Sequence, residues 1–375
     1  VQTCALPISN IVRMYTYTKA STQSIIYLDN VGNFWDIDYP NNPILTVSAA
    51  TDFGFTAYAG RAYISPCDGN KGLNNDYLYV YLGDGTAARK AAGAKPTDTD
   101  GALAAANSGG AGNIEAGIHI FAVVYETNTG FLTAIGPDTL PTVTAPGGEA
   151  VNLTNIPVSP NSYVTKVHVI ATQAINASFY TGDTRGYQFF FVPEAVVTNG
   201  TTSLSVSFFD SELLEDASYL LDMFEQIPAF AGLNTYHNRL IGWGEYANES
   251  VIRVSVAGEP EAFNQVDGLV IFPLNAEPVT NAVEYRDVMY GFKRTQTMAW
   301  TDNGDVPSSW SLSLIDHGMG ASLHSVSSVL DSNGVNADYL VVGNYSQLRS
   351  EPEQSAQSLI DLLVAGRTKK IRSKP

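Results

Sequence analysis

Short apolar runs separated by Gly, Asn, Asp and Pro recur along the whole chain, whereas runs with helical spacing are scarce. The clearest runs come in pairs around a polar turn, in residues 24–38, 60–85, 238–260, 287–305 and 338–348. Two apolar-rich strands that meet across such a turn form a β-hairpin. The pattern therefore predicts an all-β fold.

Two of these hairpins share a local motif. Tyr58-Ala-Gly-Arg61 and Tyr236-His-Asn-Arg239 both place an aromatic residue three positions before an arginine that enters a strand. Repeated hairpins that cannot bury their own apolar faces are stabilised by stacking around an axis. The repeat favours an irregular β-propeller, complete or incomplete, over a solenoid or a barrel.

The segment that follows residue 113 has a different character. Residues 114–210 carry short strands with turn signals at the spacing of a β-sandwich, in about the 100 residues that such a module needs. They predict an immunoglobulin-like or fibronectin type III-like sandwich inserted in the propeller. Residues 93–113 are rich in Gly, Ala and Asp, and we expect them to form a linker or exposed loop.

The C-terminal region predicts one amphipathic helix. Residues 350–353 read as a capping box, apolar residues follow at helical spacing from Ala356 to Leu363, and Gly366 is a stop signal. The expected segments are residues 1–8 outside the fold, 9–92 first propeller blades, 93–113 linker, 114–210 inserted sandwich, 211–348 propeller continuation, and 349–375 helix with a basic tail.

The chain has few charged residues, and most of them are acidic. Only 15% of residues are charged, and 20 Lys and Arg against 37 Asp and Glu leave a net charge of −17. An acidic surface repels phosphate, so we do not expect the main body to wrap duplex DNA. The tail at 367–375 is basic, and we interpret it as a solvated terminus, with a contact to nucleic acid or an acidic partner as the alternative.

The first eight residues of the chain have an unusual sequence. Residues 1–8 back-translate to a sequence that resembles a sequencing-adapter oligonucleotide, and we expect them to be an artefact. Cys67 is the one cysteine outside this stretch, which excludes a disulfide framework. No run reaches the roughly 18 apolar residues of a membrane-spanning helix, so no membrane span is expected.

Sequence motifs for catalysis or cofactor binding are weak. The histidines show no metal-ligand spacing, and we expect neither a metal nor a cofactor; they are His119, His168, His237, His317 and His324. In 302–310, Asp302, Gly304 and Trp310 are similar to an Asp-box turn of sialidases, but a β-turn with a buried Trp is favoured. A glycosidase carboxylate pair from distant loops stays open.

Several motifs together resemble the structural propeller proteins of tailed-phage tails, in particular the tail nozzle or tail tubular protein B group. The shared elements are an aromatic residue, an Arg entering a strand, a Gly-Glu-Pro-Glu turn and a Pro-x-x-Trp motif. We name these positions the blade signature; they are Arg61, Tyr236, Arg239, Gly258, Pro260, Pro307 and Trp310.

The resemblance implies a non-catalytic virion protein. It would be a subunit of a homo-oligomeric ring, often of six copies, that meets a portal or adaptor and other tail proteins and lets DNA pass without specific binding. Its location would be the virion tail, after assembly in the host cytoplasm. Two alternatives stay open: a host-surface or glycan-binding adhesin, and a glycoside hydrolase built on a propeller.

Overall fold

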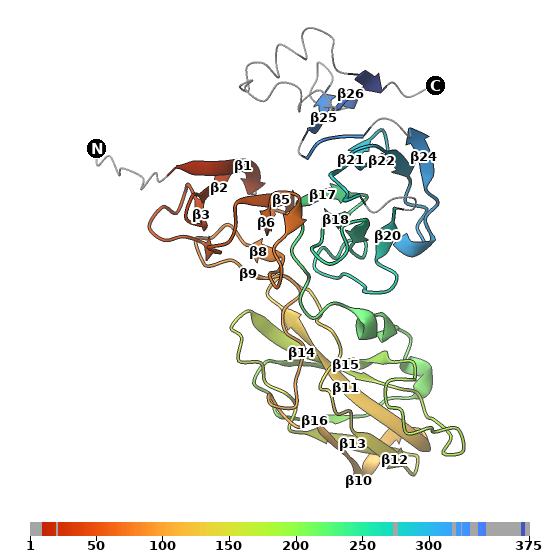
Figure 1. Ribbon diagram of the computed structural model, residues 1–375. Coiled ribbons are helices and arrows are strands. Elements are labelled where there is room, and N and C mark those ends of the chain that lie inside the picture. The colour runs from red at the N-terminus through yellow and green to blue at the C-terminus, as the bar shows by residue number, and fades with distance from the viewer. Residues whose placement is uncertain are drawn as a thin grey trace. The chain divides into compact units, whose positions relative to one another are not determined.

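The computed structural model describes residues 10–19, 22–272, 277–316, 320–323, 325–330, 337–342 and 369–371. Nearly all regular structure in these ranges is antiparallel β-sheet, which confirms the predicted all-β class (Figure 1). The chain forms two compact units. The first contains residues 1–91 and 227–375, and the second contains residues 92–226.

In the described ranges the first unit contains five sheets, whose strands follow one another in chain order except that the short strand Lys71–Gly72 pairs off this path. We name each sheet by its first strand. The strands are β1 (Ile11–Lys19), β2 (Thr22–Asp29), β3 (Asn33–Asp36) and β4 (Leu45–Thr46); β5 (Asp52–Tyr58), β6 (Arg61–Asp68), β7 (Lys71–Gly72), β8 (Tyr79–Tyr81) and β9 (Arg89–Lys90); β17 (Gly232–Tyr236), β18 (Arg239–Trp243), β19 (Val251–Val254) and β20 (Leu269–Ile271); β21 (Asn281–Tyr285), β22 (Val288–Phe292), β23 (Thr297–Trp300) and β24 (Ser313–Asp316); β25 (Val326–Leu330), β26 (Ala337–Val342) and β27 (Lys369–Ile371).

Three of the first-unit sheets begin with the same tight hairpin. The two central residues of the turns at 58–61, 236–239 and 285–288 all have positive φ, between 45° and 75°. This is the conformation of the two-residue turn that matches the right-handed twist of β-strands. The motif shared by the first two turns therefore encodes one backbone turn, and the third copy carries Val288 in place of arginine.

Neighbouring sheets of the first unit bury their faces against each other. One apolar cluster joins the β1 and β5 sheets, where the rings of Phe34 and Phe53 meet edge to face at 5.2 Å. A second cluster joins the β17 and β21 sheets through buried side chains that include Trp243, Met289 and Trp300. The core therefore lies between sheets, because a single hairpin sheet cannot cover its own apolar side chains.

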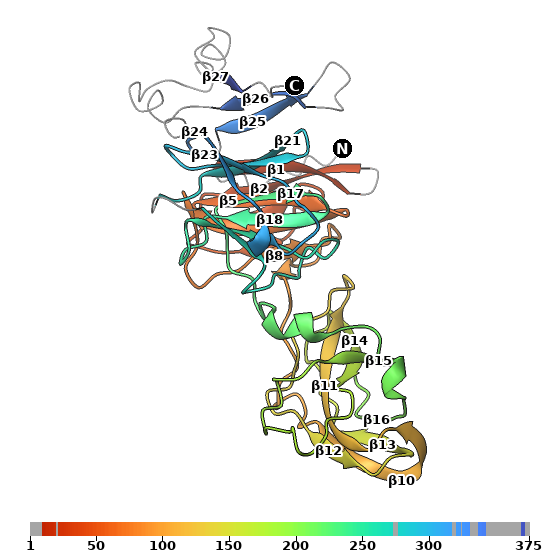
Figure 2. The same cartoon turned by 90° about the vertical axis from the view of Figure 1, so that its right-hand side faces the viewer.

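The first strands of the five sheets lie side by side. β1 contacts β5, β5 contacts β17, β17 contacts β21, and β21 contacts β25 (Figure 2). All five strands line one cavity of about 340 Å³. Its walls include Arg13 on β1, Thr56 on β5, Asn234 on β17, Asn281 on β21 and Val326 on β25.

The second unit contains two sheets that share one apolar core. The orders are β10-β13-β16 and β12-β11-β14-β15. Along β13 the buried side chains alternate with exposed ones, as expected for a strand with one face in the core. The strands are β10 (Ala104–Ile114), β11 (Gly117–Thr127), β12 (Thr142–Ala145), β13 (Glu149–Thr154), β14 (Val164–Ala171), β15 (Phe190–Thr198) and β16 (Ser203–Val206).

The structure differs from the predicted linker at 93–113. Residues 104–114 form the strand β10, which pairs with β13 and has register shifts near its end. The prediction was wrong there because Ala, Ser, Asn and Gly carry little intrinsic strand signal, and backbone pairing supplies the order instead. The second unit is also wider than the predicted 114–210, since Ala217 N–H bonds to Phe189 O and so ties the 211–226 segment to it.

The segments predicted at the two chain ends lie only partly within the described ranges. Residues 1–8 and the predicted helix that starts at 350 lie outside them. In the tail, β27 pairs with β26, so residues 369–371 belong to a sheet, whereas a solvated terminus was expected. The helical segments of the described ranges are the short 3-10 turns η1 (Asp210–Glu212), η2 (Ser218–Asp222) and η3 (Pro307–Ser309), and none has the length and apolar character that crossing a membrane requires.

Candidate functional site

The blade signature brings a buried arginine into an ionic and aromatic cluster. Arg239 begins β18, and its Nε lies 2.7 Å from Asp302 Oδ2. Its Nη1 donates to the carbonyl of Ser255 at 3.0 Å, and its guanidinium carbon lies 5.5 Å from the centre of the Trp310 ring. A buried charge needs a close counter-ion and further hydrogen bonds, and these contacts supply both.

Tyr236 joins this cluster to the next sheet. Its hydroxyl donates to the carbonyl of Asp287 at 2.9 Å and accepts from the N–H of Asp302 at 3.1 Å. Its ring meets Trp310 edge to face at 6.3 Å. Burial raises the pKa of Tyr236, which keeps the hydroxyl protonated as a donor.

The same contact recurs one sheet earlier. Tyr58, at the end of β5, donates from its hydroxyl to the carbonyl of Asn238 at 3.0 Å. Asn238 and Asp287 are the second central residues of their hairpin turns. We name these two contacts the tyrosine latches: in each, a tyrosine that ends a first strand holds the hairpin turn of the following sheet.

Of the remaining blade-signature residues, Gly258, Pro260 and Pro307 lie in turns and Arg61 begins a strand. Gly258 has a φ of 80°, which favours glycine, and its N–H bonds to the carbonyl of Asn238 at 2.7 Å. Pro260 is buried, and Pro307 is the buried first residue of η3. Arg61 begins β6 opposite Tyr58 and is half-buried, one sheet away from the Arg239 cluster.

The loop at 302–310 forms the β-turn with a buried Trp that the sequence favours. Gly304 N–H bonds to Asp302 Oδ1 at 2.8 Å, and the indole N–H of Trp310 bonds to the carbonyl of Asp305 at 3.1 Å. Trp310 is 3% exposed. Asp302 uses one carboxylate oxygen for the turn and the other for Arg239, so both oxygens serve the fold.

A second buried ion pair connects the β5 and β17 sheets. Arg89 on β9 places Nη1 2.9 Å from Glu261 Oε2, and Glu261 is 1% exposed. Glu261 closes the Gly-Glu-Pro-Glu turn, whose other acid, Glu259, is half-buried. Burial raises the pKa of Glu259. Glu261 therefore joins the two sheets, and Glu259 is a half-buried acid of the same turn.

A polar and aromatic pocket of about 690 Å³ lies in the first unit. Its lining includes Tyr77, Tyr246, Lys71 and Lys90. Lys90 Nζ lies 3.7 Å from the centre of the Tyr77 ring, and Lys71 Nζ lies 5.7 Å from that of Tyr246. Aromatic faces beside fixed polar groups are suited to the apolar faces and hydroxyls of a sugar.

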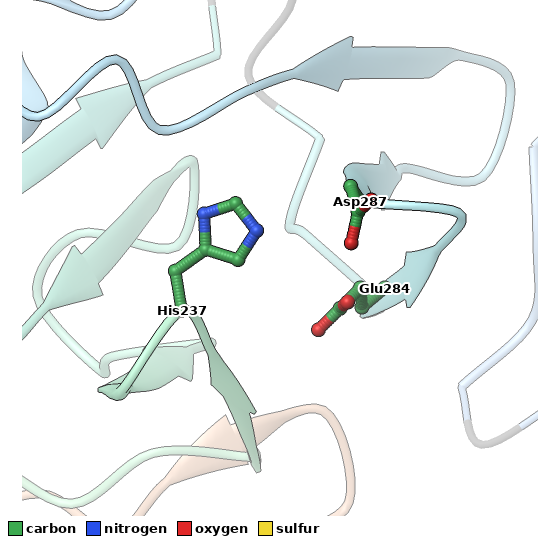
Figure 3. A group of neighbouring side chains, drawn as sticks. All are labelled: His237, Glu284 and Asp287. Carbon is green, nitrogen blue, oxygen red and sulfur yellow. The ribbon is translucent and has the colours of Figure 1, made fainter. Parts of the chain in front are cut away.

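Two hairpin turns bring together a histidine and two acids (Figure 3). His237 is the first central residue of the β17–β18 turn, Glu284 lies on β21, and Asp287 lies in the β21–β22 turn. One possible ligand atom from each lies within 4.8 Å of the others. Spacing along the chain does not predict this group, because its members come from different sheets.

The comparisons with known proteins give little guidance. No family model matches the chain, and no curated protein matches it. Among solved structures it is similar to a protein from Lactobacillus plantarum, with 13% identity, 88% of each chain covered and a TM-score of 0.22. It is also similar to the AfRom2 CNH domain, with 11% identity, 88% of this chain and 90% of that chain covered, and a TM-score of 0.21. Likenesses at these TM-scores carry no argument here.

Proposed function

We propose that the chain is a non-catalytic structural component of a bacteriophage tail, a subunit of a nozzle-like ring that forms part of the DNA conduit. In this interpretation the first unit is an irregular β-propeller. The second unit is an inserted immunoglobulin-like or fibronectin type III-like sandwich. The expected partners are other copies of the chain, a portal or adaptor, and neighbouring tail proteins.

The propeller interpretation is supported by the first strands. Sheets whose strands run in chain order, with their first strands around a common cavity, are typical of propeller blades. Arg13, Thr56, Asn234 and Asn281 reach that cavity from four different sheets. The uneven strand lengths of these sheets correspond to irregular blades.

The observation that carries the structural role is the pair of tyrosine latches. Tyr58 and Tyr236 each hold the turn of the following sheet, and the buried pairs Arg89–Glu261 and Arg239–Asp302 add ionic links. In these contacts, the most distinctive polar residues of the phage-tail resemblance hold neighbouring sheets together and so make the unit rigid. A conduit subunit requires such a rigid frame, because its wall must keep its shape while DNA passes.

The net charge fits passage of DNA without binding. At −17 the chain repels phosphate, and carboxylates along a channel would let duplex DNA slide. We expect the acidic residues to be concentrated on the lumen of the ring. A ring with an acidic exterior and a neutral or basic lumen would contradict this part of the proposal.

Electron microscopy of the purified chain tests the proposal directly. We expect negatively stained particles to be rings with a central channel, and light scattering to give the mass of a multimer. A uniform population of monomers, both alone and mixed with the portal encoded on the same genome, would overturn the ring-subunit function. Rings that retain duplex DNA on a filter at physiological salt would overturn the sliding mechanism.

The aromatic pocket favours a second candidate function, an adhesin that binds host-surface glycans. Tyr77 and Tyr246 contribute aromatic rings to the lining, and the ammonium groups of Lys90 and Lys71 lie over these rings. A glycan array with the purified chain tests it, and we expect binding that is lost in Tyr77→Ala and Tyr246→Ala. Release of a reducing sugar from a bound glycan would instead support the hydrolase alternative.

A further inference from the structure

His237, Glu284 and Asp287 form a compact set of metal-ligand types at neighbouring hairpin turns. Figure 3 shows the imidazole and the two carboxylates turned toward a common space. The candidate ligand atoms lie within 4.8 Å of one another, His237 and Asp287 are exposed, and Glu284 is half-buried. In the described part of the chain, none of the three side chains has a hydrogen bond or an ion pair.

Tyr236 contacts both of the turns that carry these side chains. The Tyr236 ring stacks on the His237 imidazole with 4.1 Å between ring centres, and the Tyr236 hydroxyl bonds to the carbonyl of Asp287 at 2.9 Å. Positive φ at His237 and Asp287 fixes both turns in the tight hairpin form. The latch between the sheets therefore also sets the separation of the ligands.

We propose that these three residues bind a divalent transition-metal ion of the Zn²⁺ class. One imidazole nitrogen and two carboxylate oxygens are ligands of zinc, and three protein ligands leave a coordination position for water. The imidazole selects against Mg²⁺ and Ca²⁺, which prefer oxygen ligands alone. The two carboxylates supply the negative charge that attracts a dication.

The geometry requires only a small closure. Bonds of about 2.0–2.1 Å in a tetrahedral site place ligand atoms about 3.3 Å apart. The exposed Asp287 side chain can rotate toward His237 over the remaining distance, since no hydrogen bond of the described ranges holds it elsewhere, while the imidazole stays stacked on Tyr236. The bound ion would join the turn of the β17 sheet to the turn of the β21 sheet and stabilise the folded state of the first unit.

Titration of the untagged, chelator-treated chain with Zn²⁺ tests the site. We expect calorimetry to give saturable binding at one site and the melting temperature to rise with Zn²⁺ concentration, whereas Mg²⁺ causes no shift. His237→Asn keeps a residue that tolerates positive φ but removes the imidazole. We expect it to weaken Zn²⁺ binding at least about tenfold, because one of three ligands is lost. Asp287→Asn, which also preserves the turn, is expected to act in the same direction.

Matched controls separate this site from other surface groups. Asp305→Asn changes an exposed acid in the loop after β23, and His168→Gln changes a histidine of the second unit. Both should bind Zn²⁺ with the affinity of the parent chain. Absence of saturable binding by the parent would overturn the proposal. Affinity of His237→Asn within twofold of the parent, with an unchanged metal-free melting temperature, would overturn it as well.

Discussion

The hydroxyl of Tyr236 donates a hydrogen bond to the backbone carbonyl of Asp287, 2.9 Å away in the hairpin turn of the following sheet. Tyr58 makes the same contact with Asn238 one sheet earlier. Each latch pairs the last residue of a first strand with the second central residue of the next turn. A local turn motif therefore also specifies how successive sheets are joined.

Removal of the Tyr236 hydroxyl should lower the stability of the first unit. In Tyr236→Phe the partly buried N–H of Asp302 and the carbonyl of Asp287 lose a partner, which costs about 1–3 kcal/mol of unfolding free energy. All four tryptophans lie in the first unit, so their fluorescence in urea follows this unit. Tyr58→Phe, at the more exposed latch, is the control and should cost about 0.5 kcal/mol. Equal losses in the two variants would contradict a special role for the buried latch.

The Arg239–Asp302 pair should show strong coupling. Arg239→Met leaves a carboxylate of 8% side-chain exposure without its cation, and we expect a loss of about 3–5 kcal/mol. Asp302→Asn should cost a comparable amount, whereas the double variant should lose less than the sum of the two. Denaturant unfolding of the parent, the two single variants and the double variant gives the free energies of this double-mutant cycle. Additive losses would show that the two side chains act independently.

Local turn chemistry explains what could be predicted of the fold. The alternating runs and the polar turns identify the hairpins, and the Tyr58 and Tyr236 motifs mark two copies of one turn. The sequence did not predict the third copy of the turn, at 285–288, because Arg286-Asp287 lacks the glycine or asparagine that usually signals it. Its backbone conformation becomes evident only when the hairpins are compared in space.

Contacts between sheets explain what could not be predicted. β10 is a strand because β13 offers a backbone edge, although its own small side chains carry no strand pattern. The group of His237, Glu284 and Asp287 depends on two turns meeting, which residue spacing does not encode. By contrast, Tyr236, Arg239 and Trp310 already stood out in sequence motifs, and the structure adds that Trp310 lies beside the other two.

Glu259 should make the stability of the first unit depend on pH. Burial raises the pKa of Glu259, and in the described ranges its Oε2 has no hydrogen-bond partner. The folded state therefore binds this proton more tightly than the unfolded chain. The stabilisation is complete below the ordinary glutamate pKa and is lost as pH rises through the raised pKa.

Replacement of Glu259 by its neutral analogue tests this linkage. Glu259→Gln should raise the melting temperature of the tryptophan-monitored transition at pH 7 and change it much less at pH 4, where the parent side chain is protonated. Glu194→Gln, which changes an exposed acid of the second unit, should show no such difference. An equal effect of Glu259→Gln at both pH values would contradict the assignment.

Gly72 should tolerate no side chain, because β7 approaches the β17 sheet too closely. Its N–H bonds to the carbonyl of Gly244 at 2.8 Å, and a Cβ at this position would overlap the backbone carbonyl of Ala229. Gly72→Ala must therefore move one backbone away from the other and lose the hydrogen bond, at a cost of about 2 kcal/mol or more. Gly110→Ala is the matched control, since the only atom near its Cβ is the flexible Ser108 Oγ at 3.5 Å. The urea midpoint of the first unit should fall in Gly72→Ala and stay unchanged in Gly110→Ala. An unchanged midpoint in Gly72→Ala would show that β7 can move away from the β17 sheet without a loss of stability.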